Sequence, residues 1–519
     1  ELMRDALPKN KKEQAVYINL INDPRYAINP MDLKVGCRFP LATDRQFIIN
    51  LMLLTMSFGD SKPNPILVNF ITDVVDAAFE YFSDSPTYTK NDPKVYTKYV
   101  VHSIDEKLAK LGYNLPDEDD LLDDIEKIND EVVLKQRKQR LTWHQVCDIL
   151  AKEGDMEDAL LATRRASPII TDLPLIARNT RSIQDKYKGM KLSDSGDERT
   201  IFDDFEFAID NVVNAYPLLS GYTKFDLGEA RLISLDLNEV AKSNGMQADM
   251  QTAIMYMYAM KLTSGDFFLS EDNVKELPFK LNVSAPEYAP VSLYKKYHAQ
   301  RIAEIREDKK RVSIDEFHRT SKSSMVREQV VTYMREGRKW GVEVILASQN
   351  INDYDKDMLD QATATFVMSA NKTSIVNDYV EKVGITDEAE IDVLKNRIHP
   401  PLGRRGNVFM AKFETKRGNF TQILNNKMGP VEIWSLSTTS EDVRLRSIIF
   451  SRVGSVIGRK VLSDAYPDGS AASDIENRKR YANVSSEQDE SIYEQVVEEM
   501  LNRYGPKYGV TGRKTTAFA

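Results

Sequence analysis

Two adjacent acids, Asp315 and Glu316, follow a short β-rich segment at residues 311–314. In a parallel sheet, such a strand carries the acids to the carboxyl edge, where ligands of these sheets bind. Asp315 is suited to hold Mg²⁺ through water, because magnesium keeps several waters in nucleotide sites. Glu316 is suited to take a proton from an attacking water. The pattern predicts a Walker B element for ATP, and taken alone it also fits a polar strand end before a loop.

A second β-rich segment, at residues 342–347, is followed directly by Ser348 and Gln349. An amide at the tip of a strand beside the acids can contact both a γ-phosphate and the attacking water. We therefore expect Gln349 to belong to the catalytic site and to report the state of the nucleotide.

The helix expected between these two strands carries Arg335, Arg338 and Lys339 and ends before Gly341. In ring ATPases, an arginine of one subunit reaches the nucleotide of the next and stabilises charge in the transition state. Arg338 is the first candidate for this trans-acting catalytic role, and Arg335 is the second. The alternative is a solvated basic helix end, which the helix dipole favours.

The phosphate-binding half of such a site is not visible. Phosphoryl transfer on this kind of fold uses a loop of the form G-x-x-x-x-G-K-[ST], and no such segment occurs. Residues 458–461 and 512–515 contain Gly-Arg-Lys, so an arginine interrupts the motif in each. Because the sequence starts at Glu1 rather than Met, we expect it to be a fragment of a longer chain. Nucleotide binding by this stretch alone is therefore in question.

The order of the predicted elements favours an α/β fold. The β-rich segments alternate with helical patterns, which argues for a parallel sheet covered on both faces; they lie at residues 231–237, 312–314, 342–347 and 365–369. Residues 406–413 and 419–424 predict an antiparallel hairpin at the sheet edge. We predict a RecA-like P-loop NTPase core with a mainly parallel sheet, plus a mostly helical insertion in which apolar residues recur at helical spacing from Leu67 to Phe79.

Composition divides the chain into four predicted parts. Residues 1–60 form the first part of the core, 61–205 the helical insertion, 206–460 the main part of the core, and 461–519 a linker with a tail helix. The linker follows from a polar run between Asp464 and Ser470, and the tail helix from apolar residues on one face of 491–504. That helix would dock on a neighbouring subunit or on the chain's own core.

Two smaller motifs have alternative interpretations. Acids from Asp117 to Asp120 suggest a calcium loop, but the glycine and glutamate that such a loop needs are out of place, so a solvated helix start fits better. Thr438 and Glu441 fit a capping box before a helix at 442–453. The alternative for residues 437–439 is a contact with nucleotide.

The composition is that of a folded protein, with 42% hydrophobic and 29% charged residues in a chain of 519. Cys37 and Cys147 are the only cysteines, which excludes a disulfide scaffold and suits a reducing cytoplasm. The longest apolar run, from Phe47 to Phe58, is too short for a bilayer span of about 20 residues. A net charge of −9 argues against nucleic acid as the main partner.

Three segments carry a family resemblance. Residues 314–322 (IDEFHRTSK), 334–349 (MREGRKWGVEVILASQ) and 429–446 (GPVEIWSLSTTSEDVRLR) resemble the DotO/IcmB-like and TraU-like ATPases of type IVB secretion systems. These are VirB-type secretion ATPases within the FtsK/HerA-like RecA superfamily. Residues 5–40 resemble the segment after the P-loop in the same proteins, so the resemblance implies that a Walker A loop and an N-terminal domain precede Glu1. The resemblance covers nearly the whole chain, and it is patchy in the insertion and weak after about residue 461.

The resemblance implies an ATP- and Mg²⁺-dependent motor at the cytoplasmic side of a bacterial inner membrane. It implies Asp315 and Glu316 as the Walker B pair, Gln349 as the sensor and, by position, Arg338 as the arginine finger. It also implies a homo-oligomer, a hexamer, whose partners are a second secretion ATPase, inner-membrane channel components and secreted effector proteins. Nucleic acid and a membrane span of its own are not expected.

Three functions compete. The first is ATP hydrolysis coupled to effector translocation or channel assembly in a Dot/Icm-like system. The second is a non-catalytic docking platform for a partner ATPase or for secreted proteins, served by the acidic insertion or the tail helix. The third is a DNA-pumping ATPase, against which the acidic charge and the lack of a basic, aromatic surface count.

Overall fold

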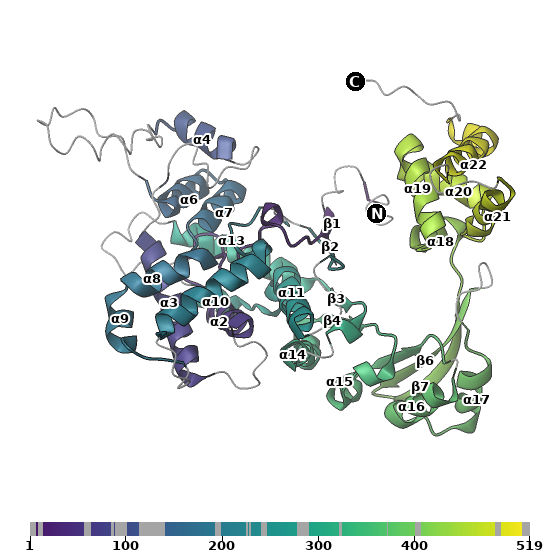
Figure 1. The fold of residues 1–519 in the computed structure, drawn as a ribbon, viewed down its shortest axis with the longest axis horizontal. Helices are drawn as coiled ribbons and strands as arrows, with labels where there is room; N and C mark the ends of the chain where they lie inside the picture. The colour runs from purple at the N-terminus through teal and green to yellow at the C-terminus, as the bar shows by residue number, and fades with distance from the viewer. Residues whose placement is uncertain are drawn as a thin grey trace, which may run out of the picture. The chain divides into compact units, whose positions relative to one another are not determined.

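The computed structural model is a mixed α/β structure that is mostly helical and has small sheets (Figure 1). It describes residues 7–8, 14–56, 64–84, 88, 101–113, 141–192, 199–224, 227, 230–239, 246–277, 290–320, 324–370, 372–399, 406–482 and 489–510. The acidic run at 117–120 and residues 512–515 lie outside these ranges, so both interpretations of the acidic run stay predictions.

Two compact units make up the chain. The first, which we call the site unit, comprises Tyr17–Gly228 and Ile233–Gln349. The second, the C-terminal unit, comprises Glu1–Val16, Glu229–Leu232 and Asn350–Ala519. The four-part division drawn from composition remains a prediction.

Helices dominate the first half of the site unit. The apolar positions expected from Leu67 to Phe79 lie on α3 and are buried. Phe70 of α3 is central, with its ring centroid 5.0–5.3 Å from those of Tyr187, Phe202 and Phe205. The helices are α3 (Pro65–Asp84), α4 (Val101–Lys110), α6 (Trp143–Lys152), α7 (Met156–Arg165), η4 (Ile170–Asp172), α8 (Leu173–Asn179), α9 (Arg181–Tyr187), α10 (Ile201–Ala215) and η5 (Pro217–Leu219).

Flanking segments complete the same hydrophobic core. They are α2 (Ala42–Met56), α11 (Met246–Ser264), α12 (Glu271–Glu276) and α13 (Val291–Glu307). The short helices η2 (Pro24–Tyr26) and η6 (Gly265–Phe268) contribute no buried residue. Residues 253–260 of α11 are all buried, so the methionines and tyrosines in this stretch are core residues. A two-stranded sheet pairs β1 (Ala15–Asn19) with β2 (Leu232–Asp236).

A buried polar cluster joins three of these segments. Arg38 forms an ion pair with Asp148 of α6 at 2.8 Å, and the hydroxyl of Tyr294 in α13 donates to the same carboxylate at 2.7 Å. Gly36 has a φ of +76°, and a Cβ there would lie 2.4 Å from the Tyr294 ring. The close approach of the chain to α13 therefore requires glycine at this position.

Two parallel strands lie in the second half of the site unit. β3 (Lys310–Ile314) pairs with β4 (Val342–Leu346) in parallel, with Lys310 opposite Val342 and Ile314 opposite Leu346. The crossover is α14 (Ser324–Trp340), whose Tyr333 packs on Phe268 with ring centroids 4.4 Å apart. Tyr333 also accepts a hydrogen bond from Ser264 at the end of α11, which fixes α14 beside α11.

The parallel sheet is smaller than the sequence predicts. Within the described ranges, β3 pairs only with β4, while β2 pairs with β1 and β5 joins an antiparallel sheet. The expectation of cover on both faces is also wrong here, because burial alternates along β3 and leaves Arg311 and Ser313 exposed. Polar residues at every second position are typical of a strand with one open face.

The C-terminal unit contains a three-stranded antiparallel sheet. β5 (Ala364–Val367) pairs with β6 (Asn407–Thr415), which forms the predicted hairpin with β7 (Gly418–Asn426). Val367 and Met410 face a small core with residues of α16 and α17. The helices here are η9 (Ile351–Asp353), α15 (Lys356–Gln361), α16 (Thr373–Val383) and α17 (Glu388–Asn396).

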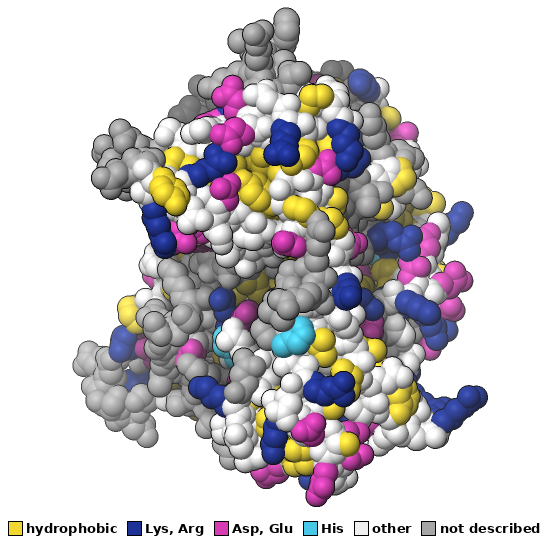
Figure 2. All heavy atoms as spheres, turned by 90° about the vertical axis from the view of Figure 1, so that its right-hand side faces the viewer, with side chains coloured by type: hydrophobic (Ala, Val, Ile, Leu, Met, Phe, Trp, Pro, Cys, Tyr) yellow, Lys and Arg dark blue, Asp and Glu magenta, His cyan; other side chains and the backbone are white. Residues whose placement is uncertain are grey.

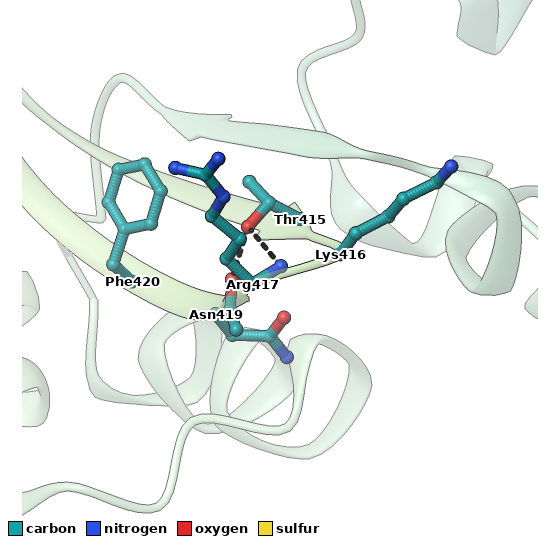
Figure 3. A pocket seen from close by; sticks show the side chains of 6 residues that line it. Thr415, Lys416, Arg417, Asn419 and Phe420 are labelled. Atoms are coloured by element: carbon teal, nitrogen blue, oxygen red, sulfur yellow. Dashed lines mark hydrogen bonds between the residues drawn. The ribbon is translucent and has the colours of Figure 1, made fainter.

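In the turn between β6 and β7, the Thr415 side chain forms hydrogen bonds with the backbone of the turn (Figure 3). The hydroxyl of Thr415 donates to the carbonyl of Gly418 at 2.7 Å and accepts from the Arg417 amide at 3.2 Å. Gly418 has a φ of +126°, a conformation that side chains rarely adopt. The turn thus holds Lys416 and Arg417 at the end of the hairpin.

Helices α18 to α22 form a bundle with a separate core. They are α18 (Pro430–Leu436), α19 (Ser440–Val453), α20 (Ser455–Ala465), α21 (Ala472–Ala482), α22 (Asp489–Tyr504) and the short η11 (Gly505–Tyr508). Trp434 is fully buried at its centre, and the apolar side of α22 packs into the same core through Val496, Val497 and Leu501. The predicted tail helix therefore docks on its own chain.

Two predictions in this bundle need correction. The polar run taken for a linker is helical or closes the bundle, because its side chains bond inward: Asp464 accepts from Lys507 and Tyr508, and Tyr466 donates to Asp474 at 2.6 Å. The capping box at Thr438 and Glu441 is also wrong, since α19 begins at Ser440 with Thr439 as its N-cap. Buried Asp442 instead accepts from Ser437, Thr439 and the Ala471 amide.

None of the described helices is both long and apolar enough to cross a bilayer. Figure 2 shows acidic and basic side chains interspersed among the described residues of one face, without a continuous basic area there.

Candidate functional site

The carboxyl ends of β3 and β4 meet in a short continuation of the strand ladder. The Ala347 amide donates to the Ile314 carbonyl at 2.9 Å, and the Phe317 amide donates to the Ala347 carbonyl at 2.8 Å. This ladder places the residues after β3 beside those after β4. It explains why Glu316 and Gln349, far apart along the chain, lie together.

Glu316 and Gln349 are in direct contact. The amide nitrogen Nε2 of Gln349 lies 3.1 Å from Oε2 of Glu316 and 3.4 Å from Oε1. His318 approaches the same carboxylate, with its Nδ1 at 3.1 Å from Oε2. All three side chains are partly or largely exposed to solvent, so the carboxylate is held but accessible.

Glu316 has an unusual backbone. Its φ of 51° and ψ of 44° lie in the left-handed region. Within the described ranges it is the sole residue other than glycine with a positive φ. Such a conformation costs roughly 1–3 kcal/mol and gathers at functional sites, where the surrounding structure enforces it. Here the chain turns from β3 into the short helix η8 (Phe317–Arg319).

Asp315 is exposed at the end of β3, one residue before the turn. Its Oδ1 accepts a hydrogen bond from the Glu316 amide at 2.9 Å. Carboxylate oxygen at an open strand end is the donor that Mg²⁺ prefers, and one or two such carboxylates suffice beside substrate phosphates. Asp315 therefore fits as the residue that would hold the ion. Among the described residues, no group of three or more His, Cys, Asp or Glu gathers as a metal site.

The turn is locked against the end of β4. Phe317 is fully buried, and the hydroxyl of Thr320 donates to its carbonyl at 2.7 Å. The His318 amide donates to the Ser348 hydroxyl at 3.2 Å. These contacts fix the backbone on both sides of the reactive carboxylate.

Further residues surround the acids. Arg319 donates to the side-chain oxygen of Asn238 at 3.2 Å. Burial raises the pKa of the Tyr256 phenol in α11; the positive charge of Arg319 opposes this rise, and the negative charges of Asp315 and Glu316 add to it. Tyr256 thus remains a neutral hydrogen-bonding group at physiological pH. The sequence analysis did not predict Tyr256, Asn238, Arg319 or His318 as site residues. His318 could have been proposed, because it is a histidine only two residues after Glu316.

Arg338 lies near the amino-terminal ends of β3 and β4, which we call the amino edge of the strand pair. It is exposed in the last turn of α14, and Gly341 then leads into the start of β4. About 13 Å of strand separates that edge from the one that carries Glu316, at about 3.3 Å per residue. Arg335 sits one turn earlier on the same helix. The structure therefore brings Asp315, Glu316 and Gln349 together, and Arg338 lies at the opposite ends of the two strands.

No family model matches the sequence, and no curated protein matches it. Among solved structures, that of VirB4 of Thermoanaerobacter pseudethanolicus resembles this one with a TM-score of 0.36 and 12% sequence identity. The match covers 83% of this chain and 79% of that chain. Overlap at this TM-score does not define a shared fold, so we base the functional proposal on the geometry around Glu316.

Proposed function

We propose that this chain is the ATP-hydrolysing subunit of a type IV secretion system. The observation that carries the proposal is the contact between Glu316 and Gln349 at the carboxyl edge of two parallel strands. An acid pair on one strand and an amide on the next is the arrangement that nucleotide hydrolysis needs at this edge.

The side chains take separate roles in this proposal. The carboxylate of Glu316 accepts a proton from the attacking water, and the Gln349 amide, already within 3.1 Å of that carboxylate, orients the water beside it. Asp315 holds Mg²⁺, which when bound neutralises charge on the phosphates. The left-handed turn and the buried Phe317 keep the base in place before substrate arrives.

The separation of Arg338 from Glu316 supports a role between subunits. An exposed arginine at the opposite edge of the strands is free to reach the nucleotide of a neighbouring copy and stabilise charge in the transition state. We therefore propose that the protein works as a homo-oligomer, in the simplest case a hexameric ring, with Arg338 acting in trans.

The choice of system rests on sequence resemblance. Residues 314–322, 334–349 and 429–446 resemble ATPases of type IVB, Dot/Icm-like systems. We propose that hydrolysis drives effector translocation or channel assembly at the cytoplasmic side of the inner membrane, with a second ATPase and channel components as partners. Pull-down of the complete protein with membrane fractions of a strain that carries such a system tests this part; recovery without channel components would reject it.

The test of hydrolysis uses Glu316→Gln in the complete protein. We expect Mg²⁺-dependent ATP hydrolysis to fall by about 10²–10⁴-fold, the usual contribution of a general base, while ATP binding persists. Glu343→Gln is the matched control, because Glu343 lies exposed on β4 and pairs only with Arg311 at 2.7 Å in the described structure. Hydrolysis at the wild-type rate in Glu316→Gln would reject the proposed function.

The competing functions receive less support. A docking platform built on the tail helix loses its apolar face, because α22 buries Val496, Val497 and Leu501 in its own bundle. A DNA pump predicts DNA binding that weakens with salt. Absence of binding at low salt would exclude the pump, whereas tight, salt-dependent binding would favour it over protein translocation.

A further inference from the structure

The outer side of β7 is a free edge of the three-stranded sheet. β7 runs for nine residues, Gly418–Asn426, and each of them is matched with a residue of β6. Within the described ranges, the sheet ends at β7, because the strand order is β5, β6 and β7. A row of backbone N–H and C=O groups along such an edge is a template for pairing with another chain.

The backbone contacts of β6 show which groups of β7 point to this free edge. The Val408 carbonyl accepts from the His399 amide at 3.1 Å, so Val408 bonds away from β7. The Glu414 amide likewise donates to the Thr363 carbonyl at 2.9 Å. In an antiparallel pair, residues that bond toward the partner strand alternate with residues that bond away from it. The residues of β7 opposite the even-numbered positions of β6 therefore point their N–H and C=O groups outward, among them Asn419, Thr421 and Ile423.

The free edge of β7 lacks the features that usually block such pairing. Edge strands of native proteins are commonly short, or they carry charges, prolines or a bulge. β7 is longer than the usual strand of about 5–6 residues, has no charged residue and no proline, and follows β6 without a bulge. Phe420 is 46% exposed on one face of the sheet, and Ile423 is 44% exposed on the other. An added strand would thus find an apolar neighbour on each face.

Basic side chains stand at both ends of β7. Lys416 and Arg417 lie in the turn before it, where their side chains extend in different directions (Figure 3). Lys427 directly follows its last residue, and all three side chains are exposed. The hairpin at 407–426 contains one acid, Glu414, which lies on β6. Two copies of β7 would place basic ends beside basic ends in either orientation, and like charges opposite one another destabilise a strand pair. The charges therefore favour a strand with acids at its ends over a second copy of this chain.

We propose that the outer edge of β7 binds an extended segment of another protein as a fourth strand of the sheet. The segment has β-branched apolar residues in its middle, which lie beside Phe420 and Ile423. It has acidic residues at both ends, which meet the basic side chains that flank β7. The outward backbone groups supply the hydrogen bonds, and the side chains supply the preference among partners. This docking edge is independent of the proposed ATP hydrolysis.

The first test uses the complete chain and a fluorescent synthetic peptide of the same length as β7. The peptide alternates valine and threonine in its middle and carries two acids at each end. We expect fluorescence anisotropy to show saturable binding that weakens as salt is added, because salt screens the charges at the ends. A peptide with lysines in place of the acids should bind at least about 10-fold more weakly, a difference of about 1.4 kcal/mol. Absence of binding, or equal binding of both peptides, would overturn the proposal.

The second test asks whether the peptide binds through its backbone. Two further peptides carry N-methyl groups on every second residue, one on the odd positions and the other on the even positions. A strand that joins a sheet edge bonds to its neighbour through alternate residues only. We expect one peptide to bind at least about 10-fold more weakly and the other to stay within about 2-fold of the parent. If both lose binding or neither does, the peptide is not an added strand.

Variants of the protein locate the binding edge. Thr421→Pro removes one outward N–H from the middle of β7, where an edge strand accepts proline. We expect Kd for the acid-ended peptide to rise by about 10-fold, with Tm near the wild-type value. Reversing both charges of the turn with Lys416→Glu and Arg417→Glu should shift the preference toward the lysine-ended peptide. Lys395→Glu, on the exposed side of α17 in the same unit, is the matched control and should leave both affinities unchanged.

The remaining outcomes separate this inference from its alternatives. Wild-type affinity in Thr421→Pro would show that the peptide binds elsewhere. Sedimentation of the wild type and of Thr421→Pro tests pairing between copies: an oligomer that dissociates on this substitution, without any peptide binding, would assign the edge to a second copy and overturn the proposal. A wild type that hydrolyses ATP but binds no peptide rejects this inference alone. A wild type that binds the acid-ended peptide but does not hydrolyse ATP rejects only the proposed function.

Discussion

The β3–β4 pair has a left-handed backbone turn at each end of its strands, formed by a glycine at one end and by a glutamate at the other. At the amino edge, the chain enters β4 through Gly341 with a φ of +65°. At the carboxyl edge, it leaves β3 through Glu316 with a φ of 51°. Glycine adopts this conformation without steric cost, whereas glutamate adopts it only at a steric cost. A side chain in a strained turn indicates that the side chain itself is needed there, which the proposed base role explains.

The edges also differ in how their polar groups are used. At the carboxyl edge, the carboxylate of Glu316 lies close to both Gln349 and His318. At the amino edge, Arg338 is exposed at the end of α14. In the proposed function, the carboxyl edge carries the base and sensor of this chain's own site, and the amino edge supplies Arg338 to the site of a neighbouring subunit.

The largest expected effect at the amino edge comes from Arg338→Ala. An arginine finger contributes roughly 10³–10⁵-fold, so hydrolysis should fall by at least about 10³-fold. Mixing Arg338→Ala with Glu316→Gln subunits should restore part of the activity, because an intact base then meets an intact arginine across an interface. Steady-state ATPase assays of the mixtures measure this, with Lys339→Ala as the control for loss of charge.

No recovery on mixing, despite formation of mixed oligomers, would contradict the trans role. In that case, the difference between the two edges would reflect only a solvated helix end, as the helix dipole allows.

Next in size is Gln349→Ala at the carboxyl edge. We expect kcat to fall by about 10²-fold, the loss typical of one preorganised donor. Gln349→Asn is the matched variant, because its shorter side chain withdraws the amide from Glu316 and should behave like Ala. If Asn and Ala differ widely, the 3.1 Å contact with Glu316 is not what matters.

A smaller effect concerns stability at the amino edge. Gly341→Ala should lower the free energy of unfolding by about 1 kcal/mol, because a side chain is strained at this φ. No atom outside its chain neighbours lies within 4 Å of the added Cβ, so crowding does not contribute. Urea unfolding measures the change. An unaltered midpoint would show that the turn relaxes easily.

The smallest effect should have the opposite sign. Glu316→Gly removes the strain at the carboxyl edge but makes the unfolded chain more flexible, so we expect a net gain of about 0.5 kcal/mol. Ser313→Gly, within β3, is the control and should destabilise. A loss in Glu316→Gly as large as in Gly341→Ala would mean that the two edges are equally strained.

The meeting of Asp315, Glu316 and Gln349 could be predicted, because parallel strands bring their carboxyl ends together. His318 could not, since its contact depends on the left-handed turn at Glu316. Tyr256 and Asn238 come from segments with no chemical motif. Helical periodicity predicted α3, and two adjacent β-rich segments predicted the β6–β7 hairpin. The partners of β2 and β5 did not, because a β-rich segment does not specify the strand beside it.

The bundle of α18 to α22 sets where the chain can be cut. Its core draws on residues from Trp434 to Leu501, so a truncation after residue 461 would remove α21 and α22 and open the packing around Trp434. Loss of partner binding in such a truncation would report unfolding, not a missing docking element. Residues 427–429, between β7 and α18, offer a boundary that removes the bundle whole and leaves the hairpin paired.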